Sequence, residues 1–267
     1  MALIPRYEKK LGVWMVPTLG FEITPNLPGY EFPELRRIFD ARLPAIQKYA
    51  DQVREFIFSP KLDAIPQNEV DGATPFWGNP YFHPGDARLL YAVIAKYRPG
   101  LIIEVGCGHS TRFMRRAIED YKTGTTLVCI DPAPRSSLAP GVADEIHQKS
   151  CTAVDVSIFQ RLKAGDVLFI DGSHLVMNGS DVVHLFLNVL PTLPEGVWVH
   201  VHDVFLPYDY PYELHINCRY NEQYLLAALF LYGRDWVPVL PIYYDYLMGL
   251  LPHGGGSFWM RKGDVSW

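Results

Sequence analysis

From residue 86 onward, short apolar runs alternate with segments whose apolar positions recur at helical spacing. Strands separated by helices in this way predict a parallel sheet with right-handed crossovers, and hence a doubly wound α/β domain. The predicted strands cover residues 101–105, 126–130, 145–149, 167–170 and 197–201, and the predicted helices cover residues 86–97, 110–121, 155–162, 180–191 and 220–232.

The chain ends in a different pattern. Gly233 follows the last predicted helix in the position of a C-cap. Two further apolar runs, residues 237–244 and 257–261, have the spacing of a β-hairpin. We therefore expect the sheet to finish with antiparallel strands.

The first 75 residues are rich in proline, aromatic and charged side chains, and they contain no apolar run that resembles a buried strand. Apolar positions at helical spacing predict two short helices, at residues 33–41 and 44–57. We divide the chain accordingly. Residues 1–75 form an N-terminal helical and aromatic cap over one edge of the main domain, which comprises residues 76–267.

Composition narrows the classes of partner. The 267 residues are 49% hydrophobic and 20% charged, with a net charge of −5, so a nucleic-acid partner is not indicated. The four cysteines include no Cys-X-X-Cys pair, which argues against a disulfide framework or a zinc knuckle. We see no signal peptide and no run long enough to span a membrane. We therefore expect a cytoplasmic protein with no membrane partner.

The residues that suggest ligand binding lie around a glycine turn. The apolar run at 101–105 is followed by Gly-X-Gly at Gly106 and Gly108, and then by a Ser-Thr pair that opens a helix. Such a turn lets the backbone approach a ligand closely. The next apolar run ends in Asp131. A glycine turn after one strand and a carboxylate after the next is the arrangement that holds an adenosine ribose.

The motif residues that this turn lacks indicate which class of nucleotide it would bind. A dinucleotide site has a third glycine and a P-loop has Gly-Lys-Ser/Thr, and neither is present at this turn. Glu104, just before the turn, is a poor neighbour for a phosphate but a good one for an ammonium group. A ligand with adenosine at one end and a cationic amino acid at the other satisfies both facts, and S-adenosylmethionine is such a ligand. A dinucleotide-dependent oxidoreductase is the less favoured alternative.

Four motifs, which contain Glu104, Asp131, Asp171 and Asp203, resemble successive motifs of class I S-adenosylmethionine-dependent methyltransferases. The most similar subgroup is the small-molecule enzymes of methyltransferase domain family 24, and the resemblance covers residues 75–262. It implies a Rossmann-like, seven-stranded, mostly parallel sheet whose last strand is antiparallel. It also implies cofactor contacts at Glu104, Gly106, Gly108 and Asp131 and near Ser150, and our predicted cofactor site includes Cys107, Ser110 and Asp171 as well.

Acidic and histidine side chains follow two neighbouring strands. Asp171 and Asp203 each end a predicted strand, His174 lies three residues after the first, and His202 directly precedes the second. Ligands in an open α/β sheet lie outside the carboxyl ends of the strands. Such a cluster can hold a divalent cation and accept a proton, although aspartates in these places also cap ordinary loops.

The resemblance assigns roles within this cluster. In metal-dependent O-methyltransferases the aspartate closing strand four is a metal ligand and a lysine three residues later is the base, which here gives Asp171 and His174. The unperturbed histidine pKa near 6.5 suits a base at neutral pH. The second ligand pair maps to His202 and Asp203, where an imidazole admits manganese, iron or zinc as well as Mg²⁺. The predicted catalytic residues are His174, Asp171 and Asp203, and the predicted metal ligands are Asp171, His202 and Asp203.

The remaining candidate side chains are a histidine on a central strand and several residues of the loops. His200 lies on a central strand and is expected to be a hydrogen-bonded core histidine. The loop at residues 205–215 is dense in proline and tyrosine, and loops at this sheet edge form pockets. Residues that enter from the N-terminal side can close the same pocket, although aromatic side chains also serve as ordinary packing. The predicted substrate-binding residues are Trp77, Tyr81, His83, Phe205 and Tyr208.

The sequence thus predicts an S-adenosylmethionine-dependent methyltransferase acting on a small molecule, most simply at oxygen, with a general base and a divalent metal. N- or C-methylation without metal, transfer of another alkyl group, and a non-catalytic cofactor-binding protein remain alternatives. The identity of the acceptor and the presence of a homo-oligomer are left open.

Overall fold

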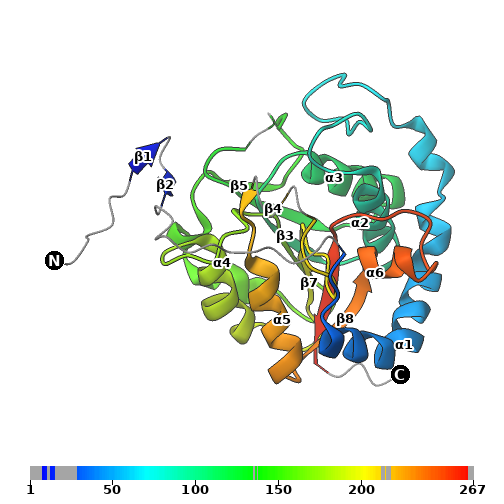
Figure 1. The fold of residues 1–267 in the computed structure, drawn as a ribbon. Helices are drawn as coiled ribbons and strands as arrows, with labels where there is room; N and C mark the ends of the chain where they lie inside the picture. The colour runs from blue at the N-terminus through cyan, green and yellow to red at the C-terminus, as the bar shows by residue number, and fades with distance from the viewer. Residues whose placement is uncertain are drawn as a thin grey trace.

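The computed structural model describes residues 8–10, 13–15 and 29–263, apart from 135, 137, 212, 213 and 215–217. Two short strands, β1 (Glu8–Lys10) and β2 (Val13–Met15), pair antiparallel near the N-terminus. The rest of this described chain is built on one seven-stranded sheet with helices on both faces, as Figure 1 shows.

The strands of the large sheet lie in the order β5-β4-β3-β6-β7-β9-β8. The first five strands along the chain pair in parallel, whereas β9 is antiparallel to both of its neighbours, β7 and β8. The predicted fold class is therefore confirmed. The strands are β3 (Leu101–Val105), β4 (Thr126–Ile130), β5 (Glu145–His147), β6 (Val167–Ile170), β7 (Trp198–Val201), β8 (Trp236–Pro241) and β9 (Phe258–Lys262).

Helices cover the two faces of the sheet through two apolar clusters. On one face, alternate strand residues pack against α4 and α5; on the other, the intervening residues pack against α2 and α3 (Figure 1). Burial of side chains on both faces explains why the central strands β4 and β6 read as continuous apolar runs. These helices are α2 (Pro84–Tyr97), α3 (His109–Tyr121), α4 (Asp181–His184) and α5 (Glu222–Tyr232).

The N-terminal helix α1 (Pro33–Ile57) is a single helix with Pro44 inside it, so the prediction of two short helices was wrong. Its first half contributes Phe39 to the cluster on the α5 side, and its second half contributes Val53 to the cluster on the α2 side. Burial of both halves keeps the helix continuous across the proline, a position that would otherwise favour a break. The helix also contacts β8 at the edge of the sheet.

Several other segments differ from their predictions in form. The segment after Asp155 is a 3₁₀ helix, Val156–Arg161, and α4 continues through a π-helical turn, Leu185–Val189, into a short 3₁₀ turn. The final hairpin is interrupted after β8 by the helix α6 (Ile242–Leu247). A further 3₁₀ segment, Pro60–Ala64, follows α1. These changes leave the carboxyl ends of the parallel strands in place.

Candidate functional site

The turn between β3 and α3 requires its first glycine. Gly106 has a φ of +87°, and a Cβ built there would lie 1.8 Å from the carbonyl oxygen of Asp171. Its backbone N–H donates to the carbonyl of Ile130, 3.0 Å away. The turn is therefore locked between the ends of the two neighbouring strands, β4 and β6, and only glycine fits.

A cavity of about 350 Å³ opens beside this turn, which is within the size range of small-ligand sites. The glycine turn forms one wall, and the ends of β4 and β6 form the others. All predicted cofactor residues except the fully buried Glu104 line it, and so does one predicted substrate residue, Tyr81. The predicted residues in its lining are Tyr81, Gly106, Cys107, Gly108, Ser110, Asp131, Ser150 and Asp171.

Asp131 joins the end of β4 to the glycine turn. Its Oδ2 accepts a hydrogen bond from the backbone N–H of Cys107 at 2.8 Å, and its Oδ1 accepts one from the N–H of Ala133 at 2.7 Å. Two backbone donors thus fix the carboxylate in the cavity wall. Each carboxylate oxygen has lone pairs beyond these bonds, so the group can still accept from ligand hydroxyls.

Glu104 lies beneath the turn and is completely buried. The hydroxyl of Ser110 donates to its Oε1 at 2.5 Å, and the hydroxyl of Thr111 donates to its Oε2 at 2.7 Å. Burial raises the pKa of Glu104 to about 7, although these hydroxyl donors oppose the shift. The thiols of Cys107 and Cys129 complete a compact group with Glu104, with ligand atoms within 4.8 Å of one another.

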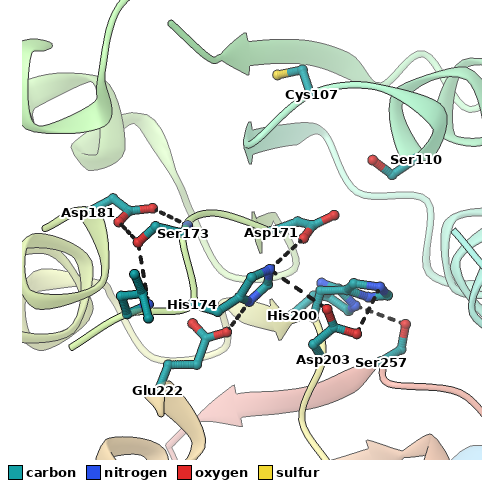
Figure 2. Close-up of polar contacts among 12 residues, drawn as sticks. Cys107, Ser110, Asp171, Ser173, His174, Asp181, His200, Asp203, Glu222 and Ser257 are labelled. Carbon is teal, nitrogen blue, oxygen red and sulfur yellow. Dashed lines mark hydrogen bonds and ion pairs between the residues drawn. The ribbon is translucent and has the colours of Figure 1, made fainter. Parts of the chain in front are cut away.

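The second part of the site is centred on His174, as Figure 2 shows. Its Nδ1 is hydrogen-bonded to Oε1 of Glu222. Its Nε2 lies 3.3 Å from Oδ1 of Asp171 and 3.8 Å from Oδ2 of Asp203. The ring of Tyr220 covers the imidazole at 4.2 Å between centroids. One imidazole therefore lies among three carboxylates.

These neighbours determine the charge of His174. Burial disfavours a charged imidazole, but the carboxylates of Glu222 and Asp171 outweigh it and raise the pKa of His174 well above 6.5. Burial alone would raise the pKa of Asp171, yet the imidazoles of His202 and His174 lower it to about 2. The expectation of an unperturbed pKa for His174 is therefore wrong. The imidazole of His174 therefore favours its protonated form more strongly than a free histidine does.

The predicted metal ligands lie beside this imidazole. Nε2 of His202 is 3.7 Å from Oδ1 of Asp203, and Asp203 has a φ of +53°, an uncommon conformation for a non-glycine residue. Within the described part of the chain, the donor atoms of Asp171, His202 and Asp203 do not gather within 4.8 Å as a set. Instead, the ring of His174 lies between the two aspartates (Figure 2).

His200 is a core residue, as predicted. It is fully buried and stacks on the ring of Phe169, with centroids 3.7 Å apart. Its Nε2 is 3.0 Å from the hydroxyl of Ser257 on the segment leading into β9. Burial lowers the pKa of His200 well below its usual value, so this imidazole is neutral.

Two of the predicted substrate residues on the N-terminal side of α2, Trp77 and His83, lie away from the cavity. The ring of Trp77 packs against Phe113 of α3, with centroids 5.3 Å apart, and the guanidinium of Arg88 lies 4.7 Å from a Trp77 ring centroid. His83 is the exposed residue directly before α2. Neither is part of the cavity wall.

The two predicted residues of the loop after β7 also lie outside the cavity wall. Phe205 is buried against the rings of Tyr210 and Tyr243. The hydroxyl of Tyr208 accepts a hydrogen bond from Arg36 of α1 at 3.0 Å. The remainder of that predicted loop includes residues 212, 213 and 215, which lie outside the described residues.

Glu222 is the site residue that the sequence did not reveal. The Asn-Glu-Gln run at 221–223 is typical of a helix start. Asn221 does occupy the N-cap position, but Glu222 turns inward to His174 and is fully buried. No motif links residues 174 and 222, which only the packing of α5 brings together.

Comparison with known proteins confirms the predicted resemblance. Residues 103–204 match the family described as methyltransferase domain. The match spans the strands β3 to β7, which carry the glycine turn, Asp131, Asp171 and Asp203. The predicted methyltransferase domain is confirmed for these residues. The curated proteins compared with this chain include none that matches it.

Solved structures resemble the chain loosely. A Podospora anserina methyltransferase bound to SAH is 14% identical; the alignment covers 91% of this chain and 100% of that one, with a TM-score of 0.45. A Bacillus cereus O-methyltransferase in complex with SAH is 13% identical, with 87% and 97% covered and a TM-score of 0.43. A Geobacter sulfurreducens methyltransferase is 17% identical, with 89% and 99% covered and a TM-score of 0.39.

Among the residues with described structure, none of the helices combines the length and apolar character that crossing a bilayer requires.

Proposed function

We propose that this chain, which carries a methyltransferase domain, transfers the methyl group of S-adenosylmethionine to a hydroxyl group of a small molecule. One observation carries the proposal. Asp171 lies in the wall of the cavity beside the glycine turn and also faces His174 at 3.3 Å. A methyl donor in the cavity therefore has a proton acceptor at its boundary, which is what methylation of a hydroxyl requires.

The cavity suits the two ends of the cofactor. Asp131 is fixed in the wall where ribose hydroxyls would donate to it. Glu104 lies fully buried under the turn, where its negative charge would favour an ammonium group bound in the cavity without direct contact. A phosphate in the same place would meet that carboxylate unfavourably. The residues thus favour a cationic nucleoside over a dinucleotide.

The chain's residues supply proton transfer and alignment. As the acceptor oxygen attacks the methyl carbon, the bond from that carbon to sulfur breaks, and the hydroxyl proton passes to Nε2 of His174. For this transfer, any proton on Nε2 of His174 must first pass to solvent, so that Nε2 can accept the hydroxyl proton. The positive sulfonium nearby favours this loss, because a second positive charge in the same site is disfavoured. Glu222 and Asp171 then hold the imidazolium that forms.

The donor chemistry around His174 also suits a divalent metal. Asp171, His202 and Asp203 offer two carboxylates and an imidazole, and the imidazole favours manganese, iron or zinc over Mg²⁺. The cluster carries an excess of carboxylates, with Glu222 and Asp86 nearby, which favours added positive charge. A bound metal would lower the pKa of a coordinated acceptor hydroxyl.

Methyl transfer tests the proposal directly. Labelled S-adenosylmethionine is incubated with the protein and with panels of phenols, catechols, sugars and matched amines, with and without a chelator. We expect label in hydroxyl compounds, with rates that fall after chelation and return with Mn²⁺. Label only in amines would replace O-methylation by N-methylation. Equal rates in both metal conditions would remove the metal, and binding without transfer would indicate a non-catalytic protein.

Replacing His174 tests the proton acceptor. With a hydroxyl acceptor, His174→Ala should lower kcat by about two to four orders of magnitude, because general-base catalysis contributes that much. The matched control is His147→Ala, on the edge strand β5, which should leave kcat unchanged. A His174→Ala rate near that of the wild type would contradict the assignment.

A further inference from the structure

The start of α5 contacts both loops that follow the central strands. The backbone N–H of Asn221 donates to the carbonyl of His174 at 3.0 Å, and Oδ1 of Asn221 accepts from the N–H of Val176 at 2.6 Å. Oε1 of Gln223 accepts from the N–H of Phe205 at 3.0 Å. The tripeptide 221–223 therefore joins the loop after β6 to the loop after β7.

Glu222, in the middle of this tripeptide, has one described hydrogen-bond partner, the imidazole of His174. It is the first residue of α5, and its exposed fraction is 0%. Its Oε1 bonds to Nδ1 of His174, and its Oε2 accepts no hydrogen bond from the described residues. A buried carboxylate is costly unless it is paired. This one is paired with the imidazole that faces the cavity wall.

The conformation of His174 needs such support. Its φ is +60°, in the left-handed region that β-carbon-bearing residues adopt at a cost. Tyr220 covers one face of the ring, and Asn221 holds the backbone carbonyl. Glu222 adds a contact at Nδ1, which fixes the orientation of the ring. Figure 2 shows the result, with Nδ1 directed to Glu222 and Nε2 to the aspartates.

We propose that Glu222 is a positioning residue: its carboxylate binds Nδ1 and fixes the ring of His174 so that Nε2 faces Asp171 and Asp203 beside the cavity wall. This inference rests on the proposed function, since it deepens the role of His174. In the proposed step, the acceptor hydroxyl loses its proton to Nε2, the Nδ1–H stays in its bond to Glu222, and the oxygen takes the methyl group. In other enzymes, a carboxylate that is hydrogen-bonded to one ring nitrogen of a histidine orients the imidazole in the same way.

Nuclear magnetic resonance tests the contact in the full-length protein. With ¹⁵N-labelled histidine, the His174 ring should show a protonated Nδ1 whose proton resonates far downfield, because its partner is a buried carboxylate. Glu222→Gln should remove that downfield signal and change the ring nitrogen shifts. Glu222→Asp should retain part of it. Glu195→Gln, the same change at an exposed carboxylate, should leave the His174 signals unchanged.

Kinetics separate positioning from a purely structural role. Once a hydroxyl acceptor is known, Glu222→Gln should lower kcat by between about 10- and 10⁴-fold, the range seen when a histidine loses its orienting partner. KM and the Kd for S-adenosylhomocysteine should stay within about twofold of the wild type, and Glu222→Asp should recover part of kcat.

Several results would overturn the inference. A wild-type His174 without a protonated Nδ1 would do so even if the Glu222 variants fail to fold. Unchanged His174 signals and kcat in Glu222→Gln would also do so, as would loss of S-adenosylhomocysteine binding together with kcat. Failure of the proposed function is a separate result. In that case the wild type would not bind S-adenosylhomocysteine, although the Nδ1–H signal of His174 would be present.

Discussion

Glu104 is a buried carboxyl group beneath the glycine turn, and on the proposed function its charge should affect how well the cavity binds a cation. Its pKa of about 7 means that it is half protonated near neutrality. An ammonium group favours the ionised form, so cofactor binding must release a proton below this pH. The affinity for S-adenosylhomocysteine should therefore rise with pH up to about 7 and change little above about 8.

Calorimetry at pH 6 and pH 8 measures this effect. We expect Kd to be weaker at pH 6 by up to roughly tenfold, since each pH unit below the pKa costs at most a factor of ten. Buffers of different ionisation enthalpy should report proton release at pH 6. Glu104→Gln removes the titrating group while retaining an acceptor for Ser110 and Thr111, so its Kd should vary less with pH. An equal pH dependence in both proteins would contradict the role of Glu104.

At the same scale, the sequence predicted the residues that depend on local pattern. Gly106 and Asp131 follow from a strand, a turn and the next strand, and each lines the cavity. His174 was predicted from its spacing to Asp171, but its raised pKa was not. That shift depends on Glu222, and the contact between residues 174 and 222 arises from tertiary packing alone.

At the scale of elements, α1 contributes strongly buried side chains to the domain. Phe39 is fully buried and meets the rings of Phe230, Tyr244 and Phe258. Phe39→Ala should therefore lower the free energy of unfolding by about 3–5 kcal/mol, the usual effect of emptying such a site. Chemical denaturation measures the change.

The control for this substitution lies just after the same helix. Phe58 is 56% exposed, and Phe58→Ala should alter the free energy of unfolding by no more than about 0.5 kcal/mol. Equal effects of the two substitutions would show that α1 does not pack as described.

The continuity of α1 could not be predicted from sequence. Proline inside a helix ordinarily predicts a break, and the pattern around Pro44 is compatible with two helices. The two halves of α1 are buried in the apolar clusters on opposite faces of the sheet, and this burial outweighs the tendency of Pro44 to break the helix. By contrast, the strands β3, β4 and β6 were predicted with their observed bounds, because strands buried on both faces read as continuous apolar runs.

At the scale of the whole molecule, strand order brings the separate motifs together. β3 lies between β4 and β6, and β6 lies beside β7, so the glycine turn, Asp131, Asp171 and Asp203 share one edge of the sheet. The resemblance to methyltransferases implied a seven-stranded, mostly parallel sheet whose last strand is antiparallel, and the structure has it. The acceptor site is less predictable, because four of the predicted substrate residues lie outside the cavity wall.

The central claim is that the cavity between the glycine turn and Asp131 holds S-adenosylmethionine. Isothermal titration of S-adenosylhomocysteine into the full-length protein tests it most directly, with Asp131→Ala and NAD as comparisons. We predict saturable binding to the wild type, at least tenfold weaker binding to Asp131→Ala, and no binding of NAD. Absence of binding to the wild type, or equal affinity in the two proteins, would contradict the account.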